Sequence, residues 1–336
     1  MPLLQQPLDY SLLKRLTQAF GPSGVEDDLR SLIEEEIRPY CDKVVQDKLG
    51  NLIAVCQGTG KRIMVASHMD EIGIMVTYIE EKGFLRFTTV GGVHIHELRH
   101  RRVQFGNGLV GVISVEKLEK PSDLKLDKLY IDIGTTSREE SEKLIRIGES
   151  AVFMGSYEET GQRIVSKALD DRLGCFIAIE TLKRLQTSYE VSFVFTVQEE
   201  VGLRGAQTAA FALEPDLAVA IDVTATGDTP KAHPMAVTLG QGVAIKVIDR
   251  SMITPPQIKE WMAQTAQEHQ IPYQWEVLEF GGTDSGVIHL SKGGVPSGVL
   301  SVPTRYIHSP SETVDRADVE ATVQLLLALL ENPVEL

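Results

Sequence analysis

Two adjacent acidic residues, Glu199 and Glu200, follow an apolar run that extends from Val191 to Val197. A run of this length, rich in Val and Phe and followed by glycine, predicts a strand buried on both faces of a mostly parallel sheet. Functional groups in such sheets lie just beyond the carboxyl ends of the strands. Carboxylates there are costly to bury unless they bind something, so the pair is either a solvated loop or part of a site.

Three further apolar segments lead into residues that can bind metal ions, namely His68, Asp222 and His308. A pair of acids, Asp170 and Asp171, opens a predicted helix. Because the carboxyl ends of parallel strands lie along one edge of a sheet, we expect these groups to converge. A set of His and carboxylate ligands without cysteine is typical of zinc or another first-row divalent ion.

The formal charge of this set indicates two ions rather than one. Three carboxylates and two neutral imidazoles carry roughly −3, which two divalent cations and a bridging hydroxide balance. Each group taken alone is better interpreted as an ordinary structural residue, but all of them together favour a metal centre. His68 and Asp70 are two residues apart in a predicted strand and therefore face the same side. Asp70 is thus expected to contact the second ring nitrogen of His68 and fix its tautomer.

The length and composition of the chain limit its class. A chain of 336 residues, 43% hydrophobic and 24% charged, is long enough for one large α/β core and a second, smaller domain. No apolar run approaches the roughly 18 residues of a membrane span, and the N-terminus lacks the pattern of a signal peptide. Three cysteines outside CxxC spacing favour reduced thiols and a cytoplasmic location. The net charge of −14 argues against nucleic acid or anionic membranes as partners.

The elements that must position these groups are predicted to form two domains. Apolar leucines, with a Gly-Pro-Ser-Gly break in which Ser23 is a possible cap, predict two helices within residues 9–37. From 72 to 163 short β-like segments alternate with Gly turns, which predicts a small β-barrel inserted in the α/β domain. The fold class is therefore α/β, with a mixed, mostly parallel sheet flanked by helices. Three histidines in the insert lack a carboxylate or Cys partner and are interpreted as surface or interface residues: His94, His96 and His100.

Six sequence blocks together resemble one family. These blocks are SHMDEIG, KALDDRLG, VQEEVGLRGA, AIDVT, GGTDSG and IHSPSE. They resemble the tetrahedral (TET) aminopeptidases, also known as glutamyl or deblocking aminopeptidases and historically called endoglucanase or cellulase M. The resemblance covers nearly the whole chain. It implies a zinc-peptidase type of fold, two divalent ions (Zn²⁺ or Co²⁺) per subunit and peptide substrates.

The resemblance also implies a role for each candidate residue. Asp170 would bridge the two ions, His68 and Asp222 would hold one, and Glu200 and His308 would hold the other. Glu199 would be the general base and Asp70 would orient His68. The substrate would contact Gly281, Gly282, Thr283 and Asp284.

The resemblance further implies an oligomer built on the inserted domain. Residues 1–71 and 164–336 would form the catalytic domain, and residues 72–163 the dimerisation domain. Dimers would assemble into a hollow tetrahedral dodecamer. The His-rich segment from 94 to 102 departs from the family pattern, which affects the expected contacts of the insert and not the chemistry.

Three other functions are weighed against the peptidase. A glycoside hydrolase needs two carboxyl groups about 5–10 Å apart across a sugar, whereas most of the acids here are assigned to metal ions. Aromatic residues form only 6% of the chain, with Trp261 and Trp275 as the only tryptophans, which disfavours a sugar-stacking platform. A non-catalytic assembly protein is disfavoured by the intact ligand set and by the presence of Glu199. A serine hydrolase is excluded because the chain has no GxSxG motif.

Overall fold

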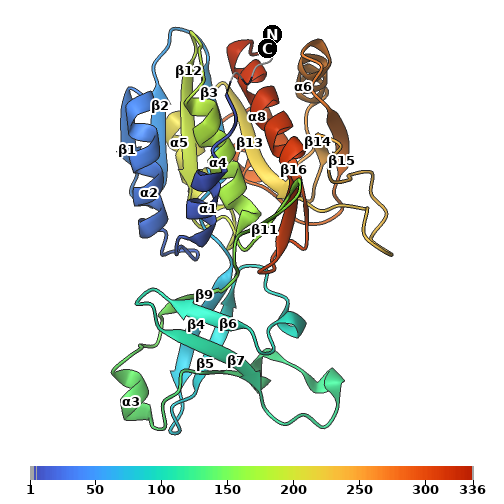
Figure 1. Cartoon of the computed structure of the whole chain (residues 1–336). Coiled ribbons are helices and arrows are strands. Elements are labelled where there is room, and N and C mark those ends of the chain that lie inside the picture. The colour runs from blue at the N-terminus through green and yellow to red at the C-terminus, as the bar shows by residue number, and fades with distance from the viewer. Residues whose placement is uncertain (1–3, 5, 335–336) are drawn as a thin grey trace.

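The computed structural model describes residue 4 and residues 6–334. Figure 1 shows two parts, a large sheet with helices on its faces and a separate barrel beneath it. The large sheet has 11 strands within the described residues, and six further strands close the barrel. This arrangement confirms the predicted fold class, a mixed α/β sheet with an inserted β-barrel.

The centre of the large sheet is parallel. Strand β3 pairs in parallel with β12 on one side and with β13 on the other, and β13 pairs in parallel with β16. The outer strands pair mainly antiparallel. In sheet order the strands are β1 (Lys43–Gln46), β2 (Leu52–Cys56), β12 (Glu190–Thr196), β3 (Arg62–His68), β13 (Leu217–Thr224), β16 (Ser297–Arg305), β17 (Glu312–Asp315), β11 (Arg163–Ser166) and β10 (Glu158–Thr160), with β14 (Val243–Ile248) beside β16 and β15 (Tyr273–Val277) beside β14.

Helices cover both faces of this sheet (Figure 1). The main core lies on the side of α1, α2, α4, α6 and α8, where the apolar faces of the helices meet the inner faces of the strands. A smaller, alanine-rich core lies under α5 and α7 on the other side. Their bounds are α1 (Tyr10–Gln18), α2 (Asp27–Ile37), α4 (Leu169–Leu182), α5 (Arg204–Leu213), α6 (Pro256–Glu268), α7 (Ser285–Ile288) and α8 (Arg316–Glu331).

The two N-terminal helices follow the predicted pattern of apolar residues. Leu12, Leu13 and Leu16 are buried on α1, as their spacing predicts. The suggested cap of α2 is wrong, because the residue at its N-cap is Glu26 and no side chain in the described part of the chain caps the helix. Ser23 instead donates a hydrogen bond to the Oδ2 atom of Asp70 over 2.5 Å. The loop before α2 therefore supports the end of β3.

The inserted barrel has its own core. Its strands are hydrogen-bonded in the order β4, β5, β8, β7, β6 and β9, all antiparallel, and closure removes the exposed sheet edges. Ile74, Phe105 and Ile131 are fully or almost fully buried inside it. The bounds are β4 (Gly73–Ile79), β5 (Leu85–Val90), β6 (Arg102–Phe105), β7 (Val110–Val115), β8 (Leu129–Asp132), β9 (Ser150–Phe153) and the short helix α3 (Arg138–Glu142).

The chain leaves the large sheet at the end of β3 and enters the barrel at β4, which begins five residues after His68. It returns through β9 to β10 and β11. Among residues 4 and 6–334, no helix has the length and apolar character needed to cross a membrane.

Candidate metal centre

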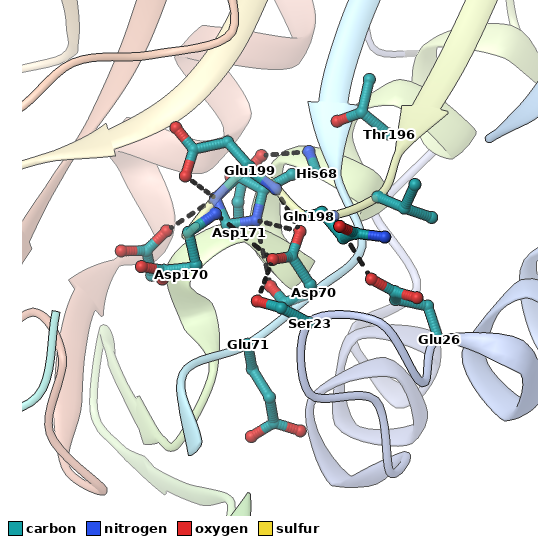
Figure 2. Close-up of polar contacts among 12 residues, drawn as sticks. Ser23, Glu26, His68, Asp70, Glu71, Asp170, Asp171, Thr196, Gln198 and Glu199 are labelled. Carbon is teal, nitrogen blue, oxygen red and sulfur yellow. Dashed lines mark hydrogen bonds and ion pairs between the residues drawn. The ribbon is translucent and has the colours of Figure 1, made fainter. Parts of the chain in front are cut away.

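The carboxyl ends of the parallel strands bring the predicted ligands together. His68 is the last residue of β3, Asp222 lies near the end of β13, and His308 follows β16. Glu199 and Glu200 follow β12, and the first turn of α4 supplies two acids. Figure 2 shows the part of this cluster around His68, where side chains from these elements point toward one another. The convergence follows from the parallel register of β12, β3, β13 and β16.

Asp170 lies between the two histidines. Its Oδ1 atom is 3.1 Å from His68 Nε2, and its Oδ2 atom is 3.2 Å from His308 Nε2. Glu200 Oε1 is also 3.2 Å from His308 Nε2. The candidate ligand atoms of His68, Asp170 and Glu200 all lie within 4.8 Å of one another. One carboxylate is therefore placed to serve two neighbouring positions.

Asp171 points in another direction because Asp170 and Asp171 both have non-helical backbone angles at the start of α4. Its Oδ2 atom accepts a hydrogen bond from the backbone N–H of His68 over 3.2 Å, and its Oδ1 atom accepts one from Gly174 over 3.0 Å. Oxygen and nitrogen atoms of His68, Asp171 and Asp222 also lie within 4.8 Å of one another. Asp171 therefore accepts hydrogen bonds from two backbone N–H groups and also lies beside His68 and Asp222, which form a second set of candidate ligands with it.

The electrostatics of the cluster fit a divalent cation. Burial raises the pKa of Glu199 and Asp222 well above the usual range, and the neighbouring carboxylates raise both further. Burial alone would lower the pKa of His68, but the carboxylates of Glu199 and Asp170 outweigh it and raise that pKa. Buried acids outnumber bases here, and bound cations would compensate their charge. The donors are imidazole nitrogen and carboxylate oxygen, which suit first-row divalent ions.

The two adjacent glutamates occupy different positions. The Glu200 carboxylate contacts His308, whereas the Oε2 atom of Glu199 is 4.0 Å from His68 Nε2. Both side chains line the same cavity. Their backbone N–H groups are held by one carboxylate, that of Asp70, over 2.9 Å from Glu199 and 3.2 Å from Glu200. The turn after β12 is therefore fixed independently of either glutamate side chain.

Asp70 contacts the Nδ1 atom of His68 through two groups. The Nδ1–H group of His68 donates to the backbone carbonyl of Asp70 over 3.0 Å, while the Asp70 carboxylate is 3.6 Å from Nδ1. Strand β3 ends at His68, so the alternation of a regular strand does not extend to Asp70. The Asp70 carboxylate also accepts hydrogen bonds from Ser23 and from the glutamate turn. A hydrogen bond at Nδ1 leaves Nε2 free to bind a cation.

Glu312 is a buried residue of the site that the sequence reasoning did not assign. Its Oε2 atom accepts a hydrogen bond from the backbone N–H of Asp170 over 3.0 Å, and its Oε1 atom accepts one from His308 over 2.8 Å. The side chain is 2% exposed. Glu312 therefore fixes the backbones of two candidate ligands that belong to different parts of the chain. In the sequence, this glutamate lies in the block IHSPSE, four residues after the histidine. That position is the pattern from which its role could have been predicted.

A cavity of about 670 Å³ opens over the cluster. Gly281 and Gly282, two of the four residues predicted to contact the substrate, line it. Thr283 and Asp284 lie behind them and are only 2% and 3% exposed. Asp284 accepts a hydrogen bond from Thr196 over 2.5 Å. The structure thus brings two of these four residues to the cavity wall.

The barrel also contributes to the cavity. Gly92 and His94, which follow β5, line it. The backbone carbonyl of Gly92 accepts a hydrogen bond from His308 Nδ1 over 2.8 Å, so the insert orients a candidate ligand of the other domain. His94 is exposed, as interpreted from the sequence, but it lies at the site and not on a remote surface.

Comparison with known proteins decides the family. The M42 glutamyl aminopeptidase family matches residues 50–325, which include the whole ligand cluster. The chain belongs to this family. As an M42 metalloaminopeptidase it is a hydrolase, and the resemblance seen in the sequence is confirmed.

Relatives of this M42 aminopeptidase align over most of their length. A protein of Acetivibrio thermocellus, named as a candidate aminopeptidase, is 53% identical over 95% of this chain and 97% of its own. Lysyl aminopeptidase from Pyrococcus furiosus is 34% identical over 97% of each chain. Glutamyl aminopeptidase from Lactococcus lactis is 29% identical over 89% of each chain.

Solved structures of the family share the fold. Aminopeptidase APDkam598 from Desulfurococcus kamchatkensis is 40% identical, with a TM-score of 0.93 over 96% of this chain and 94% of that one. The Pyrococcus horikoshii TET1 peptidase, which can assemble into a tetrahedron or a large octahedral shell, is 36% identical, with a TM-score of 0.86 over 96% and 99%. A Thermotoga maritima protein named endoglucanase is also 36% identical, with a TM-score of 0.82 over 95% and 96%.

Proposed function

We propose that this M42 aminopeptidase removes N-terminal residues from peptides with two divalent ions per chain, Zn²⁺ or Co²⁺. His68 and Asp222 would hold one ion, Glu200 and His308 the other, and Asp170 would bridge them. The observation that carries this proposal is the position of Asp170, with one carboxylate oxygen near each histidine. A carboxylate that bound a single ion would not need to face both histidines.

The chemistry of the proposed centre divides between the ions and the protein. Two bound divalent ions would polarise the scissile carbonyl group and lower the pKa of the attacking water. The Glu199 carboxylate would accept the proton of that water and deliver it to the leaving amine. The Asp70 carboxylate would hold the backbone N–H group of Glu199, and the Asp70 backbone carbonyl would orient His68. Gly281 and Gly282 would border the substrate, supported from behind by Thr283 and Asp284.

Removal of metal tests this function directly. Treatment with a chelator is expected to abolish hydrolysis of aminoacyl chromogenic amides, because the bound ions activate both the water and the carbonyl group. Addition of Zn²⁺ or Co²⁺ should restore activity, and elemental analysis of the active protein should approach two ions per chain. Full activity in a thoroughly demetallated sample would contradict the proposal.

The barrel is proposed to join subunits, with residues 72–163 as the dimerisation domain and residues 1–71 and 164–336 as the catalytic domain. None of the proposed metal ligands lies in the insert, yet it exposes several large apolar side chains. Val110, Val112, Leu144 and Ile147 are between 39% and 61% exposed. Where such residues form a continuous patch, they mark a protein interface. Related TET structures form dodecamers, and we propose the same closed particle here, built from dimers.

Sedimentation velocity tests the assembly. The parent protein is expected to sediment as a large closed particle, because exposed apolar residues on the barrel would be covered by neighbouring subunits. Ile147→Asp places a charge in that surface and should shift the distribution toward smaller species, whereas Ile253→Asp, at a 70% exposed residue outside the barrel, should not. A parent protein that is strictly monomeric and fully active would refute the assembly.

A further inference from the structure

The cavity beyond the ligand cluster has a mainly apolar wall. Two large aromatic rings of this wall, those of Phe280 and Tyr306, are 47% and 58% exposed. Exposed apolar surface inside a cavity favours an apolar ligand, because contact removes that surface from water. Further apolar side chains complete the wall: Leu203, Val223, Leu278 and Ile307.

Arg305 is the only Lys or Arg among the described residues that line this cavity. Its guanidinium group makes two bonds to the Asp228 carboxylate, 3.0 Å from Nε to Oδ1 and 2.7 Å from Nη2 to Oδ2. The hydrogen bond from Arg305 holds the pKa of Asp228 at about 2, so the pair stays ionised and its net charge stays zero at neutral pH. Both members are partly buried, with 27% and 15% of their side chains exposed.

Outside the ligand cluster, the other polar side chains of the wall are His94, Tyr306 and four threonines, namely Thr224, Thr226, Thr229 and Thr304. All four acids that line the cavity belong to the ligand cluster and its neighbour Glu199. Outside the ligand cluster, a charged side chain entering the cavity would therefore lose water without gaining an unpaired Lys, Arg, Asp or Glu from the described lining, which is unfavourable.

We propose that this aminopeptidase selects peptides whose N-terminal side chain is uncharged and apolar, of the size of leucine or phenylalanine. In this inference the Asp228–Arg305 pair determines specificity by making its own charges unavailable to acidic or basic substrates. The inference rests on the proposed aminopeptidase function and names its substrate class. Family membership leaves the class open, because relatives of this chain include both a lysyl and a glutamyl aminopeptidase.

The first experiment measures kcat/KM of the metal-loaded parent enzyme on the p-nitroanilides of leucine, phenylalanine, glutamate and lysine. Leucyl and phenylalanyl substrates should exceed both charged substrates by about 10-fold or more, the usual scale of discrimination by a pocket. A higher kcat/KM for the glutamyl or lysyl substrate would overturn the inference and leave the proposed function standing. Failure to hydrolyse any of the four would overturn the proposed function and this inference with it.

The second experiment replaces each member of the Asp228–Arg305 pair in turn. Asp228→Asn leaves Arg305 unpaired and should raise the glutamyl-to-leucyl ratio of kcat/KM by about 10-fold, since an unpaired cation can bind a carboxylate. Arg305→Gln leaves Asp228 unpaired and should raise the lysyl-to-leucyl ratio instead. The double variant Asp228→Arg with Arg305→Asp restores a neutral pair and should keep the parent ratios.

Metal content and circular dichroism of each variant serve as controls, because neither residue is a proposed ligand. Unchanged ratios in both single variants with metal retained would overturn the role of the pair. If a variant fails to fold, the panel on the parent enzyme still decides the preference for uncharged side chains.

Discussion

Replacement of Glu199 by Gln should lower kcat by roughly 10²- to 10⁴-fold, the usual contribution of a general base. The substitution keeps the shape of the side chain and removes its basicity. Metal content should stay the same, because Glu199 is not a proposed ligand and its backbone N–H is held by Asp70. Steady-state kinetics on an aminoacyl amide give kcat, and elemental analysis of the same preparation gives the metal content.

Glu200→Gln is the matched control for this prediction. It lies one residue further along the same turn, and its Oε1 atom is 3.2 Å from His308 Nε2. We expect it to weaken the binding of one ion, with activity rising again as metal is added. Loss of metal in Glu199→Gln and retention of both ions in Glu200→Gln would mean that the two roles are exchanged. A fully active Glu199→Gln enzyme would place the base elsewhere.

Asp170→Ala should empty both metal positions and abolish activity. The reason is that its two carboxylate oxygens face two different histidines, at 3.1 Å and 3.2 Å, so one truncation removes a ligand from each proposed ion. Equilibrium dialysis against Zn²⁺ should show the loss of both ions, and added metal should not restore the rate.

The adjacent Asp171→Ala variant provides the comparison. Its carboxylate accepts hydrogen bonds from the backbone N–H groups of His68 and Gly174, so truncation leaves two buried donors unpaired. That change should lower the free energy of unfolding by about 1–3 kcal/mol while at least one ion remains bound. If Asp171→Ala empties the centre and Asp170→Ala keeps both ions, the bridging residue is Asp171.

Several parts of the site depend on contacts that no local sequence pattern reveals. Glu312 holds the backbones of Asp170 and His308, residues that are far apart in the chain. Gly92 and His94 reach the cavity only because the closed barrel is attached directly after β3. The pairing of Arg305 with Asp228 joins the end of β16 to a loop 77 residues earlier.

The sequence by itself determined the strands of the parallel core, the residues at their carboxyl ends and the family. These follow from short-range rules, because apolar runs predict buried strands and parallel strands place their ends along one edge. The tertiary structure alone decided how each carboxylate is oriented. Asp70 bonds to the glutamate turn, for example, because β3 ends at His68. It also decided which charges in the cavity are already paired. Such pairings depend on the packing of distant segments, which residue spacing along the chain does not encode.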